Sequence, residues 1–186
     1  MWRLFAVALI CMTLPSGAEE VTGEPPDYRM DHYRAPVPDT LAGATVVASE
    51  QAHALWQSGD VAFVDVMPQA PKPANLPEGT IWREKPRQSI PGSVWLPNVG
   101  YGALHETVDA YFRAGLVQAT VGNKDRAVLF FCLADCWMSW NAAKRALEYG
   151  YTKIYWYPEG TDGWAFEDFP LEKTAPFASD GSVGDG

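Results

Sequence analysis

The chain lacks a surplus of positive charge and has few residues that bind metals. Its 186 residues include 14 lysines and arginines against 23 aspartates and glutamates, which gives a formal net charge of −9. Nucleic-acid binding needs a basic footprint, so this balance argues against a nucleic-acid partner. The pair Cys132 and Cys136 has no histidine nearby in the sequence and supplies only half of a closed zinc shell. Trp137 stands where a haem attachment motif requires histidine, so we expect no metal and no required cofactor.

The chain also lacks a long apolar run beyond its first residues. Residues 1–18 contain Arg3 near the start, an apolar run over 4–14 that is too short to span a membrane, and small residues before a cut ahead of Glu19. This pattern predicts a secretory signal peptide. We therefore expect no membrane span and an exported protein that resides in the periplasm. That compartment is oxidising, so two nearby thiols would oxidise there unless something keeps them reduced.

Both cysteines beyond the signal peptide lie between a predicted strand and a predicted helix. Residues 127–131 are continuous, apolar and bulky, which suits a central strand covered on both faces. Residues 139–149 are rich in helix formers and are followed by Gly150. Cys132 would lie at the carboxyl end of the strand and face the amino end of the helix, where unpaired N–H groups and the helix dipole favour a thiolate. Cys132 is therefore a candidate nucleophile.

Cys136 offers a second thiol four residues after Cys132. In a curled loop it could reach Cys132 and resolve a persulfide or a mixed disulfide there by intramolecular attack. Trp137 could pack over the thiols, stack on a flat organic partner, or be an ordinary core aromatic. The alternative for the pair is an inert Cys132–Cys136 cross-link.

Strands alternate with helices along the chain, which indicates an α/β fold with a mostly parallel central sheet and helices on both faces. Strands are expected at 45–47, 61–66, 127–131 and 153–157, and residues 90–97 are expected to form a turn followed by a short strand. Helices are expected from the N-cap Ser49 to about 57, and over 104–120 and 139–149. Ligands of such folds bind outside the carboxyl ends of the strands. Asp65, Cys132 and a Gly-rich loop at 158–164 would meet there, and we favour a loop-capping role for Asp65.

Three further segments flank or interrupt the predicted domain at 45–172. Residues 19–44 are polar and Pro-rich and predict an extended arm. Residues 173–186 are rich in Gly, Ser and Asp and predict a flexible tail. A long Pro-rich loop at 67–89 is often a functional feature in a compact domain. Its cationic residues could cover the active loop and attract an anion, or they could simply be solvated: Lys72, Arg83, Lys85 and Arg87.

The chain resembles the rhodanese-like domains over about residues 45–172. The matching segments occur in the family order and are Phe63-Val64-Asp65-Val66, Ile90-Pro91-Gly92-Ser93, the strand entering Cys132, Ala142-Ala143 with Gly150-Tyr151, and Glu159-Gly160 ahead of Trp164. This resemblance implies a rhodanese-like fold and a nucleophilic Cys132 that takes a sulfane sulfur as a persulfide, held by the N–H groups of the loop. The residues that would then shape the substrate site are Leu133, Ala134, Asp135, Trp137, Met138 and Ser139, with Asp65, Arg83, Arg87 and Trp164 as accessory residues.

The loop departs from the family pattern in two places. Asp135 stands where a basic residue would steer thiosulfate, and its charge would repel a dianion. The loop is also one residue longer than in typical sulfurtransferases, and Met138 occupies the region where related phosphatases carry arginine. Ordinary thiosulfate sulfurtransferase or phosphatase activity is therefore not expected.

More narrowly, the Cys-Trp loop and the export signal resemble the exported PQQ-dependent catabolism-associated CXXCW motif proteins, although three residues separate Cys132 from Cys136. This resemblance implies redox or sulfur-relay chemistry that supports periplasmic alcohol oxidation. The partner would be a quinoprotein dehydrogenase or its redox partner, with only an indirect link to PQQ. The alternative is a non-catalytic binding module of such a system, with a structural Cys132–Cys136 disulfide.

Overall fold

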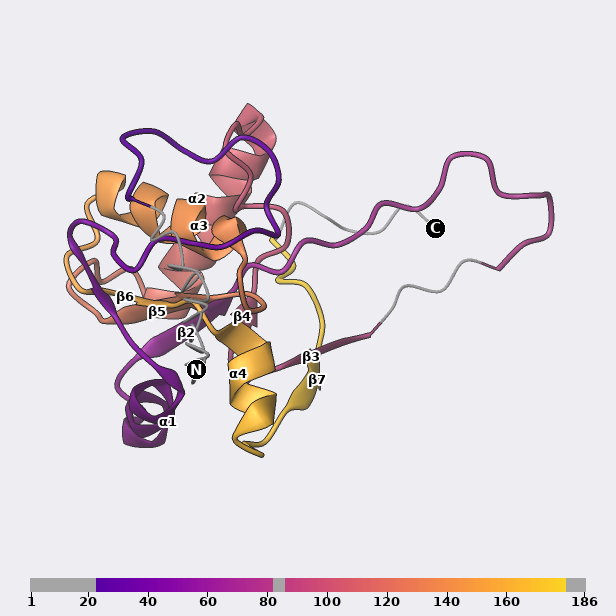
Figure 1. Ribbon diagram of the computed structural model, residues 1–186. Coiled ribbons are helices and arrows are strands. Elements are labelled where there is room, and N and C mark those ends of the chain that lie inside the picture. Colours follow the sequence, from indigo (N-terminus) through magenta and orange to yellow (C-terminus); the bar gives the residue numbers. More distant parts are fainter. Residues whose placement is uncertain (1–22, 82–85, 180–186) are drawn as a thin grey trace, which may run out of the picture.

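A five-stranded parallel sheet forms the centre of the computed structural model, which describes residues 23–81 and 86–179 (Figure 1). Each strand pairs in parallel with its neighbours. In spatial order the strands are β1 (Ala44–Val46), β6 (Ile154–Tyr157), β5 (Val128–Phe131), β2 (Ala62–Asp65) and β4 (Val94–Trp95). The predicted α/β fold with a parallel central sheet is confirmed. Because β5 is the middle strand, the residue that follows it lies at the centre of the carboxyl edge.

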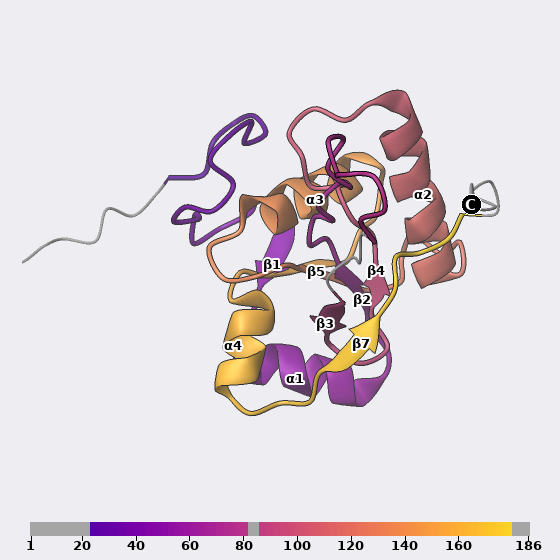
Figure 2. The same ribbon diagram turned by 90° about the vertical axis from the view of Figure 1, so that its right-hand side faces the viewer.

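Four helices cover the two faces of this sheet (Figure 2). They are α1 (Ser49–Ser58), α2 (Glu106–Thr120), α3 (Trp137–Glu148) and α4 (Gly160–Phe166). Alternate residues of β5 point to opposite faces, so Val128 and Phe130 pack with α2 and α3 while Leu129 and Phe131 pack with α1 and α4. All four residues are fully buried. The continuous apolar run that predicted this strand is therefore explained by a core on each side.

Three predicted boundaries differ in the structure. Helix α1 begins at Ser49 with Ala48 as its N-cap, because the Gln51 side chain accepts the Ala48 N–H at 3.1 Å. Helix α3 begins at Trp137, two residues earlier than expected, with Cys136 as its N-cap. The loop expected at 158–164 is largely the short helix α4. Its Gly-rich sequence is a poor helix former, but the buried Trp164 anchors it against the core.

Two short strands were not predicted. Strand β3 (Arg87–Ser89) pairs antiparallel with β7 (Glu172–Thr174), so the long loop ends in a strand and the tail begins later than residue 173. Both strands are polar and lack the alternation of apolar and polar residues from which a strand is predicted. After β7, the Phe177 N–H donates to Trp95 O at 2.8 Å and the Tyr111 hydroxyl donates to Phe177 O at 3.0 Å.

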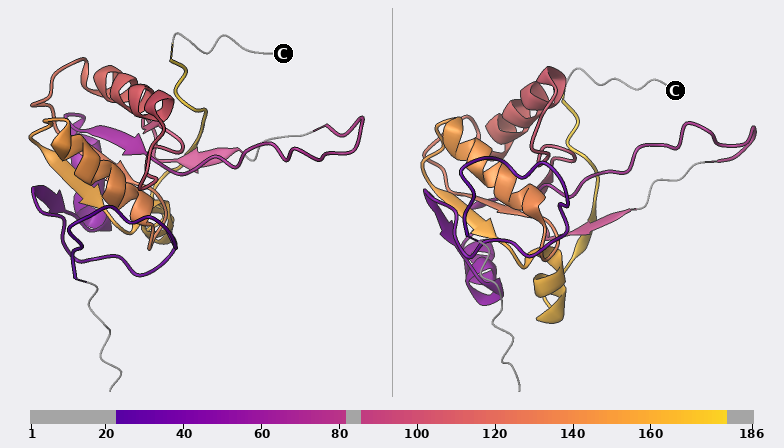
Figure 3. Two further views of the ribbon diagram at one scale, coloured as in Figure 1. Left: turned by 90° about the horizontal axis from the view of Figure 1, so that it is seen from above. Right: turned by 45° about the horizontal axis from the view of Figure 1, so that its top comes forward.

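Two segments without regular structure lie outside these layers (Figure 3). The N-terminal arm, here residues 23–43, runs over the first turns of α3. Residues 67–81 leave the carboxyl end of β2 and run far from the sheet, with Lys72 exposed. The expected signal peptide and the cationic residues Arg83 and Lys85 lie outside the described residues. Within the described ranges, no helix is both long enough and apolar enough to cross a membrane.

Candidate functional site

Cys132 directly follows β5 and is fully buried at the carboxyl edge of the sheet. Its sulfur lies 3.7 Å from the Met67 Sδ, and Met67 follows the end of the neighbouring strand β2. The Cys132 carbonyl oxygen accepts three hydrogen bonds. The donors are the Thr161 N–H at 3.0 Å, the Thr161 hydroxyl at 3.2 Å and the Arg87 Nη2 at 3.3 Å. These bonds fix the backbone where the loop leaves the strand.

The loop after Cys132 turns so that Cys136 becomes the N-cap of α3. Asp135 adopts a left-handed conformation with φ 51°, which ends the loop sharply. The backbone N–H groups of Leu133, Met138 and Ser139 face the Cys136 sulfur, and the Cys132 thiol can hydrogen-bond to it once Cys136 is ionised. Together these donors form what we call the sulfur cradle. The Cys132 S–H also has the Met67 Sδ as an acceptor at 3.7 Å. The Cys132 hydrogen bond, followed by the N–H groups, lowers the pKa of Cys136 to about 7 against the opposing effect of burial.

The two thiols differ in how readily they ionise. Burial raises the pKa of Cys132 well above its ordinary value, and the adjacent Cys136 raises it further. When the pair loses one proton, these shifts favour the thiolate on Cys136. The sequence favoured a thiolate on Cys132; in the structure the N–H groups of Met138 and Ser139 approach the Cys136 sulfur, and that of Leu133 approaches both sulfurs. Both residues are free thiols in the structure.

Asp65 organises the neighbouring strand end and is fully buried. Its Oδ1 accepts the Met67 N–H at 2.9 Å, which is the expected loop-capping bond. Its Oδ2 lies 2.7 Å from the Arg87 Nε and accepts the Ser89 hydroxyl at 2.6 Å. Burial raises the pKa of the Asp65 carboxyl, and Arg87, Ser89 and the Met67 N–H offset part of this increase. Because Arg87 also binds the carbonyl of Cys132, the predicted accessory residues Asp65 and Arg87 support the thiol loop together.

The N-terminal arm covers the side of the loop that carries Cys136. The Ala35 N–H donates to Asp135 O at 3.2 Å, and the Trp137 N–H donates to Tyr33 O at 2.9 Å. The Trp137 indole Nε1 donates to Pro36 O at 3.1 Å, and its side chain is only 1% exposed. Trp137 is therefore a core aromatic held by the arm, and it offers no free face to a flat partner.

The other predicted loop residues divide into two groups. Leu133 and Ala134 are half-buried, whereas Met138 and Ser139 are buried in the first turn of α3. The Ser139 hydroxyl donates to Cys136 O at 2.9 Å, which strengthens the first turn of the helix. Trp164 is not brought to the thiols: it lies in the core formed with α1.

Two residues of the site were missed by sequence reasoning. Met67 could have been found from its position directly after the predicted strand 61–66. Thr161 lies in the segment 158–164 that was expected to meet Cys132, but its bonds to the Cys132 carbonyl depend on the close approach of the unpredicted helix α4. Gly160 allows this approach: a Cβ there would lie 2.5 Å from Cys132 O, and the residue has φ 53°.

A pocket of about 720 Å³ opens beside Cys132 and is mostly apolar; we call it the Met67 pocket. Its apolar walls are formed by Met67, Pro68, Trp95, Leu133, Ala165 and Leu171. The polar residues that line it are Gln69, Arg87, Gln88, Thr161 and Asp162. Since Met67 contacts the Cys132 sulfur and Leu133 follows Cys132, this pocket adjoins the candidate nucleophile.

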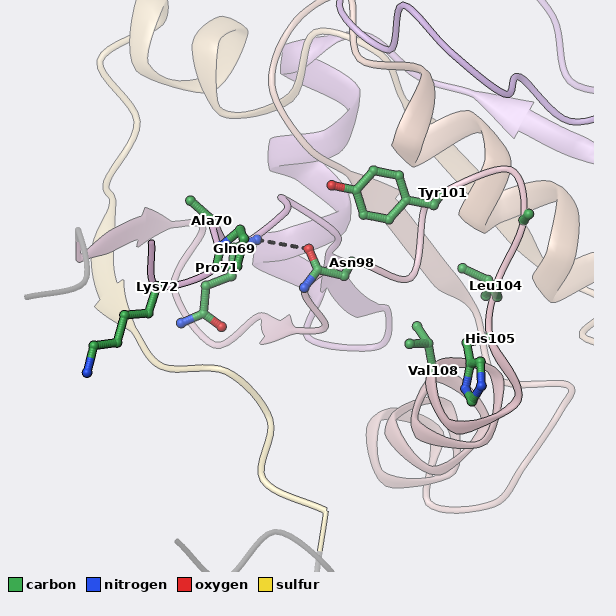
Figure 4. Close-up of a pocket in the computed structure, with 10 residues that line it drawn as sticks. Gln69, Ala70, Pro71, Lys72, Asn98, Tyr101, Leu104, His105 and Val108 are labelled. Atoms are coloured by element: carbon green, nitrogen blue, oxygen red, sulfur yellow. Dashed lines mark hydrogen bonds between the residues drawn. The ribbon is translucent and has the colours of Figure 1, made fainter. Parts of the chain in front are cut away.

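A second pocket of about 420 Å³ is lined in part by Gln69 and Ala70 (Figure 4). It is lined by residues that include Lys72, Asn98, Tyr101 and His105, and the Gln69 N–H donates to Asn98 Oδ1 at 3.2 Å. Neither cysteine is among the lining residues of either pocket, but only the Met67 pocket is lined by Met67, which contacts the Cys132 sulfur, and by Leu133, which follows Cys132. We therefore place the candidate chemistry at the Met67 pocket.

Several solved structures are similar to this chain. It is similar to the polysulfide-sulfur transferase homodimer from Wolinella succinogenes, with 16% identity and a TM-score of 0.43 over 70% of this chain and 80% of that chain. An EanB variant in complex with hercynine has 22% identity and a TM-score of 0.49 over 76% of this chain. This chain spans only about a third of that protein, 34%. A protein of unknown function from Rhodopseudomonas palustris, described as a possible tyrosine phosphatase, has 19% identity and a TM-score of 0.44 over 74% of this chain and 100% of that chain.

No curated protein matches the chain. The model of the rhodanese-like domain matches residues 48–167, which extend from the start of α1 to the end of α4. This range includes the thiol loop, Asp65 and Arg87. The chain belongs to the rhodanese-like domain family.

Proposed function

We propose that the chain is a dithiol protein in which Cys132 is the nucleophile and Cys136 acts first as its base and then as the resolving thiol. One observation carries this proposal: the Cys132 thiol lies next to a Cys136 sulfur that is held in the sulfur cradle, and the two can hydrogen-bond. A thiol that already donates to a neighbouring thiolate can pass its proton along that bond. The nucleophile can therefore form without a histidine, and the proton remains within the pair.

The first step oxidises Cys132. With a disulfide R–S–S–R, Cys136 takes the proton of Cys132, the Cys132 sulfur bonds to one substrate sulfur, and the substrate S–S bond breaks to release RS⁻. In the second step the Cys136 sulfur attacks Cys132, its proton leaves with the departing RSH, and a Cys132–Cys136 disulfide forms. The substrate gains two electrons and the protein loses two.

A persulfide substrate gives a sulfur-relay version of the same route. If Cys132 accepts a sulfane sulfur, attack by the Cys136 thiolate on Cys132 releases HS⁻ and leaves the same disulfide. The N–H groups that would hold the outer sulfur of a stable persulfide already face the Cys136 sulfur. We therefore favour a transient persulfide over a stored one, and a redox cycle over ordinary sulfur transfer.

The physiological setting belongs to the same proposal. The signal-like residues 1–18 support export to the periplasm, and the Cys-Trp loop supports a link to PQQ-dependent alcohol catabolism by resemblance. The partner would be a quinoprotein dehydrogenase or its redox partner, which must return two electrons to the disulfide in each cycle. PQQ itself need not touch this chain.

The test is the state of the two thiols in protein isolated without reductant. Intact mass before and after reduction, with peptide mapping, distinguishes free thiols, a persulfide on Cys132 and a Cys132–Cys136 disulfide. We expect a disulfide that a dithiol buffer reduces reversibly. In Cys136→Ser, treatment with an organic disulfide should trap a mixed disulfide on Cys132. A Cys132–Cys136 disulfide that resists reduction in the folded protein would instead indicate the non-catalytic binding module.

A further inference from the structure

The Met67 pocket is larger and more apolar than a small sulfur anion requires. Its volume of about 720 Å³ is in the range of pockets that bind organic molecules. A thiosulfate ion would leave most of this space empty and would lose its water against apolar walls such as Trp95, Leu133 and Leu171. The shape and the lining therefore favour a substrate with an apolar organic body.

The charged residues around the pocket also favour an uncharged substrate. Arg87 is the only Lys or Arg among its described lining residues, and it is already ion-paired with the buried Asp65 at 2.7 Å. Asp162 also lines the pocket and is half exposed, and its Oδ2 lies 3.9 Å from the Nη2 of Arg34, which does not line the pocket. The same Oδ2 accepts the Ala134 N–H at 3.1 Å, so the carboxylate is held beside the thiol loop. A substrate anion would thus meet a carboxylate and no uncommitted cation among the described lining residues.

Met67 connects this pocket to the thiols. Its half-buried side chain lines the pocket and also contacts the Cys132 sulfur at 3.7 Å. Methionine is unbranched and changes rotamer easily, so its movement can bring a pocket ligand against Cys132. The arm covers the other side of the loop through Ala35 and Tyr33, which leaves the Met67 side as the route of approach.

We infer that the substrate of the thiol pair is an uncharged organic disulfide or persulfide with an apolar body, and that it binds in the Met67 pocket with its sulfur toward Cys132. This inference rests on the proposed function and names the substrate class of the same site. The two sources share a sulfur–sulfur bond on an apolar organic group. They differ in the product: a disulfide releases two organic thiols, whereas a persulfide whose outer sulfur is taken releases one organic thiol and HS⁻.

The first experiment compares two aromatic disulfides that differ in charge. Dithiodipyridine is uncharged at neutral pH, and dithiobis(nitrobenzoate) is a dianion; each releases a coloured product. Their rates with the reduced full chain are divided by their rates with a small free thiol, which removes intrinsic reactivity. We expect the normalised rate to favour dithiodipyridine by about tenfold or more, because the dianion must lose water and approach Asp162. A normalised ratio near one would overturn the inference.

A matched pair of variants locates the preference. Ala165 lines the pocket, whereas the next residue, Phe166, is 85% exposed and is not one of its lining residues. Ala165→Lys should reduce the preference for the uncharged probe by about tenfold by attracting the dianion into the pocket, and Phe166→Lys should change it much less because its charge lies outside the pocket. Both rates are measured on the same variant, so a partial loss of folded protein cancels from the ratio. Equal shifts in the two variants would show that the preference arises outside the pocket.

The products separate failure of this inference from failure of the proposed function. If both probes yield the Cys132–Cys136 disulfide without a charge preference, the pocket is not the substrate site but the dithiol cycle stands. If neither probe yields that disulfide, the proposed function fails as well. For the persulfide source, benzyl persulfide should release HS⁻ from the native chain, while Cys136→Ser should retain the added sulfur on Cys132.

Discussion

Replacing Cys132 with alanine should raise the pKa of Cys136. The hydrogen bond from Cys132 is the largest influence that lowers this pKa, from 9.0 to about 7. A shift of that size stabilises the thiolate by about 2.7 kcal/mol relative to the thiol. At neutral pH it raises the thiolate fraction from about 1% to about one half. Without the donor, burial acts against the remaining N–H groups alone, so most Cys136 should be protonated at neutral pH.

The assay is the ultraviolet absorbance of the thiolate, followed as a function of pH for the reduced proteins. The native chain should gain its first thiolate around pH 7. Cys132→Ala should titrate at higher pH, and Cys132→Ser should lie between the two, because its hydroxyl can still donate to the Cys136 sulfur. The rate of alkylation of Cys136, measured by peptide mapping, should follow the same order of midpoints.

One result would refute this reasoning. If Cys132→Ala titrates at the native midpoint or below it, the N–H groups of α3 alone set the pKa, and the Cys132 S–H is not a proton donor to Cys136. The proposed transfer of the Cys132 proton would then lose its basis. A midpoint that rises in both Cys132→Ala and Cys132→Ser by the same amount would mean that packing, rather than the hydrogen bond, holds the cradle together.

Two further substitutions test the support of the thiol loop through the free energy of unfolding in urea. Arg87→Met leaves Asp65 buried without its cation and should cost about 3–5 kcal/mol at neutral pH. The cost should shrink in mild acid, because the already raised pKa of Asp65 rises further and its protonation removes the buried charge; a loss independent of pH would contradict this explanation. Gly160→Ala places a Cβ 2.5 Å from Cys132 O and should cost more than about 2 kcal/mol. Gly59→Ala, at φ 72° with nothing within 4 Å, should cost only about 1 kcal/mol, and equal losses would show that backbone strain rather than the close approach decides.

The sequence was most informative where one local pattern determined the structure. The apolar run before Cys132 could only be covered on both faces, and β5 is indeed the buried middle strand. The same pattern placed Cys132 and Asp65 at one edge of the sheet, since parallel strands end together. The polar strands β3 and β7 have no such pattern, because they pair through their main chains and bury few side chains.

The charge distribution within the thiol pair could not be predicted from spacing. It depends on the left-handed Asp135, which turns the Cys136 sulfur back toward the N–H groups of Leu133 and Met138. A non-glycine residue gives no local signal for such a conformation, although aspartate tolerates it better than most. The arm was likewise predicted only as extended chain, because its hydrogen bonds to the loop join segments about a hundred residues apart.

The longer loop and the acidic residue within it have a common physical consequence under the proposed function. In a persulfide carrier, the N–H groups of the loop hold a sulfur that arrives with the substrate. Here Asp135 turns the chain so that Cys136 brings its own sulfur to these donors, next to Cys132. The loop therefore needs no basic residue to attract a sulfur anion, because the anion that it stabilises is part of the chain. Because Cys136 replaces the substrate as the source of the negatively charged sulfur, an apolar pocket can adjoin Cys132. The substrate then contributes only the sulfur atom that Cys132 attacks.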